Sequence, residues 1–350
     1  FTGIVRDKQR RKMSKQLGNS PDPIDLIEKY GADGVRVGSL LSSAAGNDLL
    51  FDEDLMLQGR NFATKIWNAY KLIQGWKRDE NIKAKEFDNQ TINWFGEQLN
   101  KTIGEIEDQF SKFRISDALH LVYKLIWDDF CAWYLEAIKP NFGEAISEEV
   151  YQETIAYFEE LMKLLHPFMP FLSEELWQNI SERSISEALV IAQQKKSEPY
   201  NEDKIKDFDF AKEVISGVRN YRQSKGISPR ETVEVFTNIS ELTNAEVIKK
   251  LANISEINFN QKTDKPSFTF LVGANEFSIP LSENLDLGEE KEKTEEEIKY
   301  LKGFLISVDK KLSNEKFVAN AKPEVVEIER KKQKDALDKI VLLEEKLKTL

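Results

Sequence analysis

The sequence predicts a mainly helical protein of several domains, and three observations carry that prediction. Apolar residues recur at three- and four-residue spacing over much of residues 54–200, as they do on the buried face of a helix. Short runs that alternate apolar and polar residues follow between residues 201 and 288, which is typical of strands. From residue 289 the apolar residues keep a heptad spacing. We therefore expect an antiparallel helical bundle, a small α+β module and a carboxy-terminal antiparallel coiled-coil hairpin.

Composition excludes several classes of protein. The 350 residues are enough for two or three domains, each with its own core. A net charge of −11 argues against indiscriminate coating of nucleic acid, although local basic groups could still bind RNA. Cys131 is the single cysteine and there are two histidines, so we expect no disulfide and no bound metal. No apolar run approaches the ~20 residues of a membrane span. We expect a cytoplasmic protein that does not enter a membrane.

A basic loop near the amino terminus is the strongest candidate for chemistry. Five of the nine residues from Asp7 to Lys15 are basic, and Gly18-Asn19-Ser20-Pro21 follows as a break in regular structure. Lysine suits polyphosphate because it is a compact charge on a long flexible stem. For an anonymous basic run, however, a solvated turn is the more common explanation.

The letters of this loop favour the phosphate interpretation. Lys12-Met13-Ser14-Lys15, followed by Leu17-Gly18-Asn19, resembles the KMSKS signature of class I aminoacyl-tRNA synthetases, and residues 21–36 resemble the segment that follows it in the valine, isoleucine and leucine enzymes. The resemblance implies that Lys12 and Lys15 are catalytic. It also implies that Lys12, Met13, Ser14 and Lys15 bind ATP, with Mg²⁺ as a companion. Gln16 departs from the pattern, since the family usually has a serine there, which leaves the loop's fine hydrogen bonding open.

Residues 1–53 read as the end of a larger catalytic domain followed by a connecting segment. Phe1–Val5 could form a strand, for which the sequence offers no partner. Ser20-Pro21-Asp22-Pro23 predicts a helix start and Gly31 its end. The apolar residues expected on its buried face are Ile24, Leu26, Ile27 and Tyr30. For Asp33 and Arg36, three residues apart, a local ion pair and a tRNA contact are equally open.

Residues 54–200 predict about five helices with short connections, an antiparallel bundle. The expected helices after the first are 91–111, 116–138, 148–166 and 173–181. Three phrases, at residues 59–69, 129–136 and 165–177, resemble the valyl-tRNA synthetase family, which implies an anticodon-binding domain. We expect most aromatic residues here to be core, and a minority to stack on unpaired bases.

Residues 201–288 predict a small α+β module. The expected helices are 208–223 and 244–252, and the expected strands are 232–236, 267–271 and 276–279. Four basic residues are expected to point outward, where they meet tRNA phosphates or only solvent: Arg219, Arg222, Lys225 and Arg230.

Residues 289–350 predict two heptad helices that fold back at Pro323. The expected seam consists of Ile298, Leu301, Leu305, Val308 and Leu312 in the first helix and of Ala336, Ile340, Leu343, Leu347 and Leu350 in the second. Residues 312–327 resemble the carboxy-terminal arm of the valyl-tRNA synthetase family, which lies against tRNA. The candidate phosphate contacts are Arg330, Lys331, Lys332 and Lys334. A homodimerising coiled coil is the alternative.

The resemblance as a whole implies an enzyme that attaches valine to its tRNA through a valyl-adenylate, working as a monomer on ATP, valine and a valine-specific tRNA. The nucleotide-binding core and the editing domain are not among these residues, so we expect a carboxy-terminal fragment that is inactive alone. Two alternatives remain. One is an isoleucine enzyme, although one cysteine cannot build the terminal zinc site of its bacterial forms. The other is a non-catalytic tRNA-binding or scaffold protein.

Overall fold

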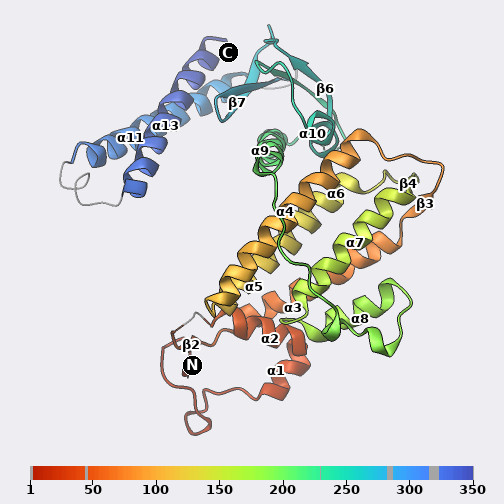
Figure 1. The fold of residues 1–350 in the computed structure, drawn as a ribbon. Coiled ribbons are helices and arrows are strands. Elements are labelled where there is room, and N and C mark those ends of the chain that lie inside the picture. Colours follow the sequence, from red (N-terminus) through yellow and green to blue (C-terminus); the bar gives the residue numbers. More distant parts are fainter. Residues whose placement is uncertain (1–2, 44–45, 229, 282–286, 315–322, 350) are drawn as a thin grey trace. The chain divides into compact units, whose positions relative to one another are not determined.

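The protein is described by a computed structural model over residues 3–43, 46–228, 230–281, 287–314 and 323–349. It forms two compact units, Phe1–Phe208 and Asp209–Leu350, which are described one by one below. The predicted mainly helical class is confirmed, with a helical bundle and two small sheets in the first unit and a four-stranded sheet in the second (Figure 1). The predicted boundaries between domains stay predictions.

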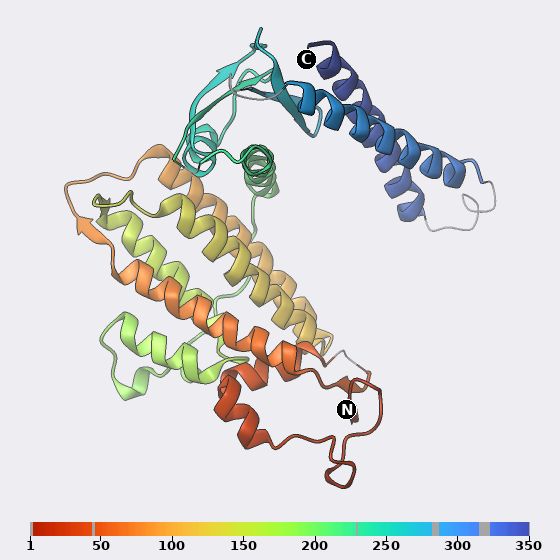
Figure 2. The ribbon, with the colours of Figure 1, turned by 180° about the vertical axis from the view of Figure 1, so that it is seen from behind.

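Long helices lying side by side make up most of the first unit (Figures 1 and 2). They are α3 (Glu53–Gln74), α4 (Glu86–Ser111), α5 (Ile115–Lys124) and α7 (Glu148–Leu165). From α5 the chain continues through a π-helical segment, Leu125–Tyr134, into the short α6 (Leu135–Ile138). The predicted helix 116–138 is therefore continuous but not α-helical throughout. The predicted helix 91–111 begins five residues earlier, at Glu86.

Aromatic side chains fill the core of this bundle. Trp94, Phe95, Phe130 and Phe158 are each at most 1% exposed. The Phe95 ring lies 5.4 Å from Phe130 and the Phe130 ring 5.8 Å from Phe158, which are distances of favourable ring packing. Cys131 is buried beside them, and burial raises the pKa of its thiol to about 12. It behaves as a small apolar residue rather than as a nucleophile.

Two short helices, α1 (Pro23–Tyr30) and α2 (Ala32–Leu41), precede the bundle. The side chain of Asp22 accepts a hydrogen bond from the Ile24 amide, and Gly31 follows the last residue of α1, as predicted. The predicted buried face of α1 is half wrong: Leu26 and Tyr30 are buried, whereas Ile24 is 61% and Ile27 39% exposed. In this short helix only one narrow face meets Met56 of α3.

Glycines let α2 lie almost against α3. A Cβ atom on Gly59 would lie 2.6 Å from the carbonyl oxygen of Gly34, and one on Gly38 would lie 2.6 Å from the Met56 nitrogen. Both distances are far below van der Waals contact, so only hydrogen fits at these crossings. The connecting segment is thereby held directly to the first helix of the bundle.

Two pairs of short parallel strands tie distant segments together. β1 (Val5–Arg6) pairs with β2 (Leu49–Leu50), and β3 (Lys77–Asp79) pairs with β4 (Ala145–Ser147). The expectation that the amino-terminal strand has no partner is therefore wrong. Its partner consists of two residues more than 40 positions away, too short to be recognised as a strand in the sequence.

The predicted local ion pair between Asp33 and Arg36 is not formed, and both side chains bind backbone groups of residues 167–172 instead; a tRNA contact stays a prediction. The Asp33 carboxylate accepts hydrogen bonds from the amides of Phe171 (3.4 Å) and Leu172 (2.7 Å), in the first turn of α8 (Pro170–Ile180). Arg36 donates to the carbonyl oxygens of Phe168 and Pro167, at 3.4 and 3.2 Å. The two side chains therefore fasten α2 to the α7–α8 connection, more than 130 residues away.

The second unit contains a mixed four-stranded sheet of order β6-β5-β8-β7. Its strands are β5 (Val233–Thr237), β6 (Ile254–Phe259), β7 (Ser267–Val272) and β8 (Asn275–Pro280), with β5 and β6 parallel and the other pairs antiparallel. The three predicted strands are present within a residue or two, and β6 was not predicted. Two helices accompany the sheet, α9 (Glu202–Ser224) and α10 (Ala245–Ala252).

One face of the sheet packs against α9. The Tyr221 ring stacks on Phe268 at 4.9 Å and the Phe210 ring lies 6.1 Å from Phe277. Phe277 pairs across the ladder with Thr237, the neighbour of Phe236. Because successive side chains of a strand point to opposite faces, Phe236 lies on the face away from α9.

The predicted antiparallel hairpin is confirmed. It consists of α11 (Leu287–Leu312) and α13 (Pro323–Thr349), side by side in both views (Figures 1 and 2). The ion pairs Glu297–Lys339 (2.8 Å), Lys302–Glu344 (2.6 Å) and Lys311–Glu329 (3.4 Å) join the two helices. The buried seam residues include Ile298, Val308, Ala336, Ile340 and Leu343, whereas Leu350 lies outside the described residues. The apolar seam is thus satisfied within one chain. In the described part, no helix is long and apolar enough to cross a lipid bilayer.

Candidate functional site

The basic loop leaves β1 and returns beside it before α1 begins. The Met13 amide donates to the Val5 carbonyl oxygen at 2.9 Å, and Arg6 and Lys12 form a single antiparallel bridge. A short 3₁₀ turn, Lys15–Leu17, follows and ends at Gly18, whose φ of 62° favours glycine. The loop therefore has defined internal structure around Met13 and Ser14.

A buried carboxylate organises the loop. Asp7 is only 8% exposed, and its carboxylate accepts hydrogen bonds from the amides of Gln9 (3.0 Å) and Arg11 (2.9 Å). It also accepts from the Arg11 guanidinium at 2.8 Å and from the side-chain amide of Asn19 at 2.9 Å. The hydrogen bonds from Asn19 and Arg11 lower the pKa of Asp7 to about 2, against the opposing effect of desolvation.

Asn19 connects this carboxylate to the signature residues. Its Oδ1 accepts a hydrogen bond from the Ser14 amide at 2.9 Å, while its Nδ2 donates to Asp7 and, at 3.4 Å, to the Lys12 carbonyl oxygen. We call Asp7 and Asn19 together the loop clasp. The clasp fixes the backbone on both sides of Met13, although 12 residues separate its two members.

The basic residues of the loop differ in whether they form ion pairs. Lys8 is paired with Asp52 (3.0 Å) and Asp54 (3.5 Å), and Arg11 with Asp7. Lys12 and Lys15 are exposed, and neither forms an ion pair with any residue that the structure describes. They are therefore the two ammonium groups of the signature that remain available to an anionic ligand.

The chemistry of the loop fits the phosphates of ATP better than a metal ion. Lysine donates hydrogen bonds and positive charge, and it supplies no ligand to Mg²⁺, which prefers carboxylate and phosphate oxygens. Within the described ranges, no group of three or more His, Cys, Asp or Glu side chains is placed to hold a metal ion.

The basic residues predicted on the α+β module differ from one another. Arg222 is not outward: it is 7% exposed and donates to the carbonyl oxygens of Ser228 and Glu231. It closes the α9–β5 loop, so the predicted outward position of Arg222 is wrong. Arg219 is exposed but donates to the Leu251 carbonyl oxygen at the end of α10. Lys225 is half-buried and Arg230 is exposed.

The basic residues predicted on the hairpin share an exposed position on α13. Arg330, Lys331, Lys332 and Lys334 are all exposed, and Lys332 pairs with Glu329 at 2.7 Å. Whether they contact tRNA stays a prediction.

Sequence reasoning missed the residues that support the loop. Asp7 precedes Arg11 by four residues, and Asn19 lies in the break that ends the basic run. An acid before a basic run and an Asn within a turn are the available signals, because both residues readily accept hydrogen bonds from local amides.

Comparisons with known proteins assign families to three segments. Residues 1–52 match the family of class I tRNA synthetases (I, L, M and V), residues 93–237 match the anticodon-binding domain of tRNA ligases, and residues 286–350 match the valyl-tRNA synthetase tRNA binding arm.

Curated relatives cover the whole chain. It is 53% identical over 353 residues to a valine–tRNA ligase of Christiangramia forsetii and 49% identical over 352 residues to one of Phocaeicola vulgatus. A valine–tRNA ligase of Fusobacterium nucleatum is 36% identical over 374 residues. The chain spans 40% of the length of the first two relatives and 42% of the third. The chain therefore belongs to the valyl-tRNA synthetase family of the class I tRNA synthetases.

Proposed function

We propose that this chain is the tRNA-binding part of a valine–tRNA ligase and that it supplies the lysine loop of the active site. The observation that carries the proposal is a pair of exposed lysines, Lys12 and Lys15, without an ion pair among the described residues, on a loop that the clasp holds in shape. The whole chain matches valine–tRNA ligases, which supports valine as the amino acid and tRNA as the RNA substrate.

The proposed reaction has two steps. The valine carboxylate attacks the α-phosphorus of ATP, the bond to the bridging oxygen breaks, and valyl-adenylate and pyrophosphate form. The 3′-terminal ribose of the tRNA then attacks the valyl carbonyl carbon and AMP leaves. No covalent nucleophile of the protein is needed, so the rate depends on placement and on charge stabilisation.

Lys15, and next Lys12, stabilise the negative charge that grows on the leaving pyrophosphate. Met13 and Ser14 shape the loop between them: the Ser14 hydroxyl accepts a hydrogen bond from the Leu17 amide at 3.3 Å and caps the 3₁₀ turn. The Mg²⁺ that accompanies ATP in this family would arrive on the phosphates and add positive charge there.

The remaining segments bind tRNA. In this proposal the bundle meets the anticodon, and exposed cations of the α13 helix meet tRNA phosphates. The protein acts as a monomer in the cytoplasm, which is supported by the hairpin seam being buried within one chain and by the buried, free thiol of Cys131. The chain alone does not activate valine, because the nucleotide-binding core is not among its residues.

The test is Lys15→Ala in the complete enzyme, with Lys8→Ala as the matched control. Both changes remove one positive charge from the same loop, but Lys8 is already paired with Asp52. Lys15→Ala should lower the rate of valine-dependent ATP–pyrophosphate exchange far more than it weakens valine binding, because its charge is needed mainly as pyrophosphate leaves. Equal losses in Lys15→Ala and Lys8→Ala would contradict the assignment.

A further inference from the structure

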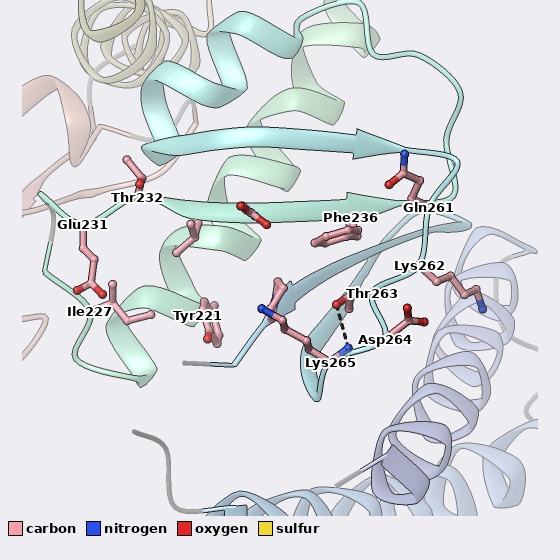
Figure 3. A pocket seen from close by; sticks show the side chains of 13 residues that line it. Tyr221, Ile227, Glu231, Thr232, Phe236, Gln261, Lys262, Thr263, Asp264 and Lys265 are labelled. Carbon is pink, nitrogen blue, oxygen red and sulfur yellow. Dashed lines mark hydrogen bonds between the residues drawn. The ribbon is translucent and has the colours of Figure 1, made fainter. Parts of the chain in front are cut away.

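A pocket of about 520 Å³ lies in the α+β module, beside the start of β5 (Figure 3). Two loops frame it, one between α9 and β5 and the other, residues 261–265, between β6 and β7. None of the three family matches covers residues 238–285, which lie along the chain between the anticodon-binding match and the tRNA binding arm. We propose that this pocket binds one unstacked nucleotide of the tRNA. The choice of RNA as the ligand rests on the proposed function.

The floor of the pocket offers an aromatic surface. Phe236 is half-buried on the sheet face away from α9, and its ring contacts no other aromatic ring in the described part of the chain. Unpaired RNA bases stack on such rings, a contact worth roughly 1–3 kcal/mol per base. Tyr221 and Ile227 line the side nearer α9 (Figure 3).

The charges around the pocket are separated. Glu231 lies at one end and Lys262 at the other (Figure 3), with Glu234 and Lys265 also in the lining. None of these four side chains forms an ion pair with a described residue. Lysine can neutralise a phosphate, and a carboxylate can accept a hydrogen bond from an amino group on a base edge. The arrangement therefore suits a nucleotide whose base carries an exocyclic amino group.

The loop that carries the lysines is already shaped. The Gln261 amide donates to the Thr237 carbonyl oxygen at 3.1 Å, and the Lys265 amide donates to the Thr263 hydroxyl at 3.2 Å. The Leu281 amide, from the end of β8, donates to Pro266 at 2.8 Å. Less ordering is needed on binding, which favours affinity. The volume also falls within the ~300–1,000 Å³ that is usual for small-molecule sites.

The test measures binding of short fluorescent single-stranded RNAs and of labelled tRNA to the 350-residue chain by anisotropy. Phe236→Ala should weaken binding of a cytidine or adenosine oligonucleotide about 5- to 150-fold, the loss of one stacked base. Phe236→Tyr should restore most of it. Lys265→Gln should weaken binding and flatten its salt dependence, whereas Lys249→Gln, an equal charge change at a lysine paired with Glu246, should not.

The outcomes separate this inference from the proposed function. Because Lys265 is exposed, its replacement does not threaten the fold, and thermal unfolding would confirm that each variant is intact. If RNA binding is equal in the parent chain, Phe236→Ala and Lys265→Gln, the pocket proposal is overturned, whatever the complete enzyme does. If the complete enzyme fails to charge tRNA with valine while the oligonucleotide results hold, the proposed function fails and the pocket stands. A uridine oligonucleotide that binds as tightly as cytidine would remove the role given to Glu231 and Glu234.

Discussion

The loop clasp allows a sharp test of how the lysine loop is held. In Asn19→Ala the Ser14 amide loses its acceptor, and Asp7 and the Lys12 carbonyl oxygen lose a donor. Two of these hydrogen bonds measure 2.9 Å and the third is long, at 3.4 Å. At about 1 kcal/mol net for each good bond, the ordered loop should lose roughly 2 kcal/mol relative to disordered alternatives.

This loss of free energy predicts a lower rate of valine activation. If valine activation needs the clasped loop, roughly 2 kcal/mol corresponds to about a 30-fold lower fraction of competent enzyme, since 1.4 kcal/mol is tenfold. Valine-dependent ATP–pyrophosphate exchange by the complete enzyme should fall by up to that factor. In the 350-residue chain, hydrogen exchange at the Ser14 and Leu17 amides should become faster.

Gln16→Ser is the control, because Gln16 is exposed in the same loop and the clasp does not involve its side chain. Its activity and exchange rates should stay close to the parent's. Faster amide exchange in Asn19→Ala with unchanged activity would show that the clasp does not position the lysines. Unchanged exchange would refute the energetic argument itself.

Acid offers a second way to open the clasp. Hydrogen bonds hold the pKa of Asp7 at about 2, below its ordinary value of 3.8. A lowered pKa means that the folded loop prefers the charged carboxylate. The stabilisation that this carboxylate gives the loop is therefore complete above about pH 4 and is lost as the pH falls through 2. Amide exchange at Ser14, corrected for intrinsic rates, should therefore stay protected at pH 4.

Three further outcomes concern the frame around the site. Asp33→Ala leaves the first turn of α8 without its acceptor and should destabilise the first unit by about 1–2 kcal/mol, visible as a lower thermal midpoint; an unchanged midpoint would contradict that role. Gly59→Ala forces a Cβ against α2 and should cost about 1–3 kcal/mol, whereas Gly303→Ala, where nothing lies within 4 Å, should be neutral or slightly stabilising; equal effects would refute the close packing. Deleting residues 292–350 from the complete enzyme should raise the Michaelis constant for tRNA and flatten its salt dependence while valine activation stays nearly unchanged. Unchanged tRNA kinetics together with loss of a dimer in sedimentation would favour a dimerising coiled coil.

Local patterns in the sequence were sufficient to predict the helices and the hairpin. The heptad spacing around Ile298 and Ala336 and the break before Pro323 predicted the antiparallel arm, because period and helix breakers are short-range properties. The letters Lys12 to Lys15 likewise identified the lysine loop without any fold. The helix start within residues 20–23 and the helix end at Gly31 could be predicted for the same reason.

Contacts between distant residues were decided only by the tertiary structure. The β1–β2 pair, the Asp33 and Arg36 contacts with the α7–α8 connection and the clasp of Asp7 with Asn19 have no periodic signal. Arg222 is the clearest case, since its place on an amphipathic helix predicted an outward cation, and it closes a loop instead. A hydrophobic pattern says which face of a helix is buried by apolar neighbours. It does not say where carbonyl oxygens of another segment will need a hydrogen-bond donor, because that depends on how the chain folds back against the helix.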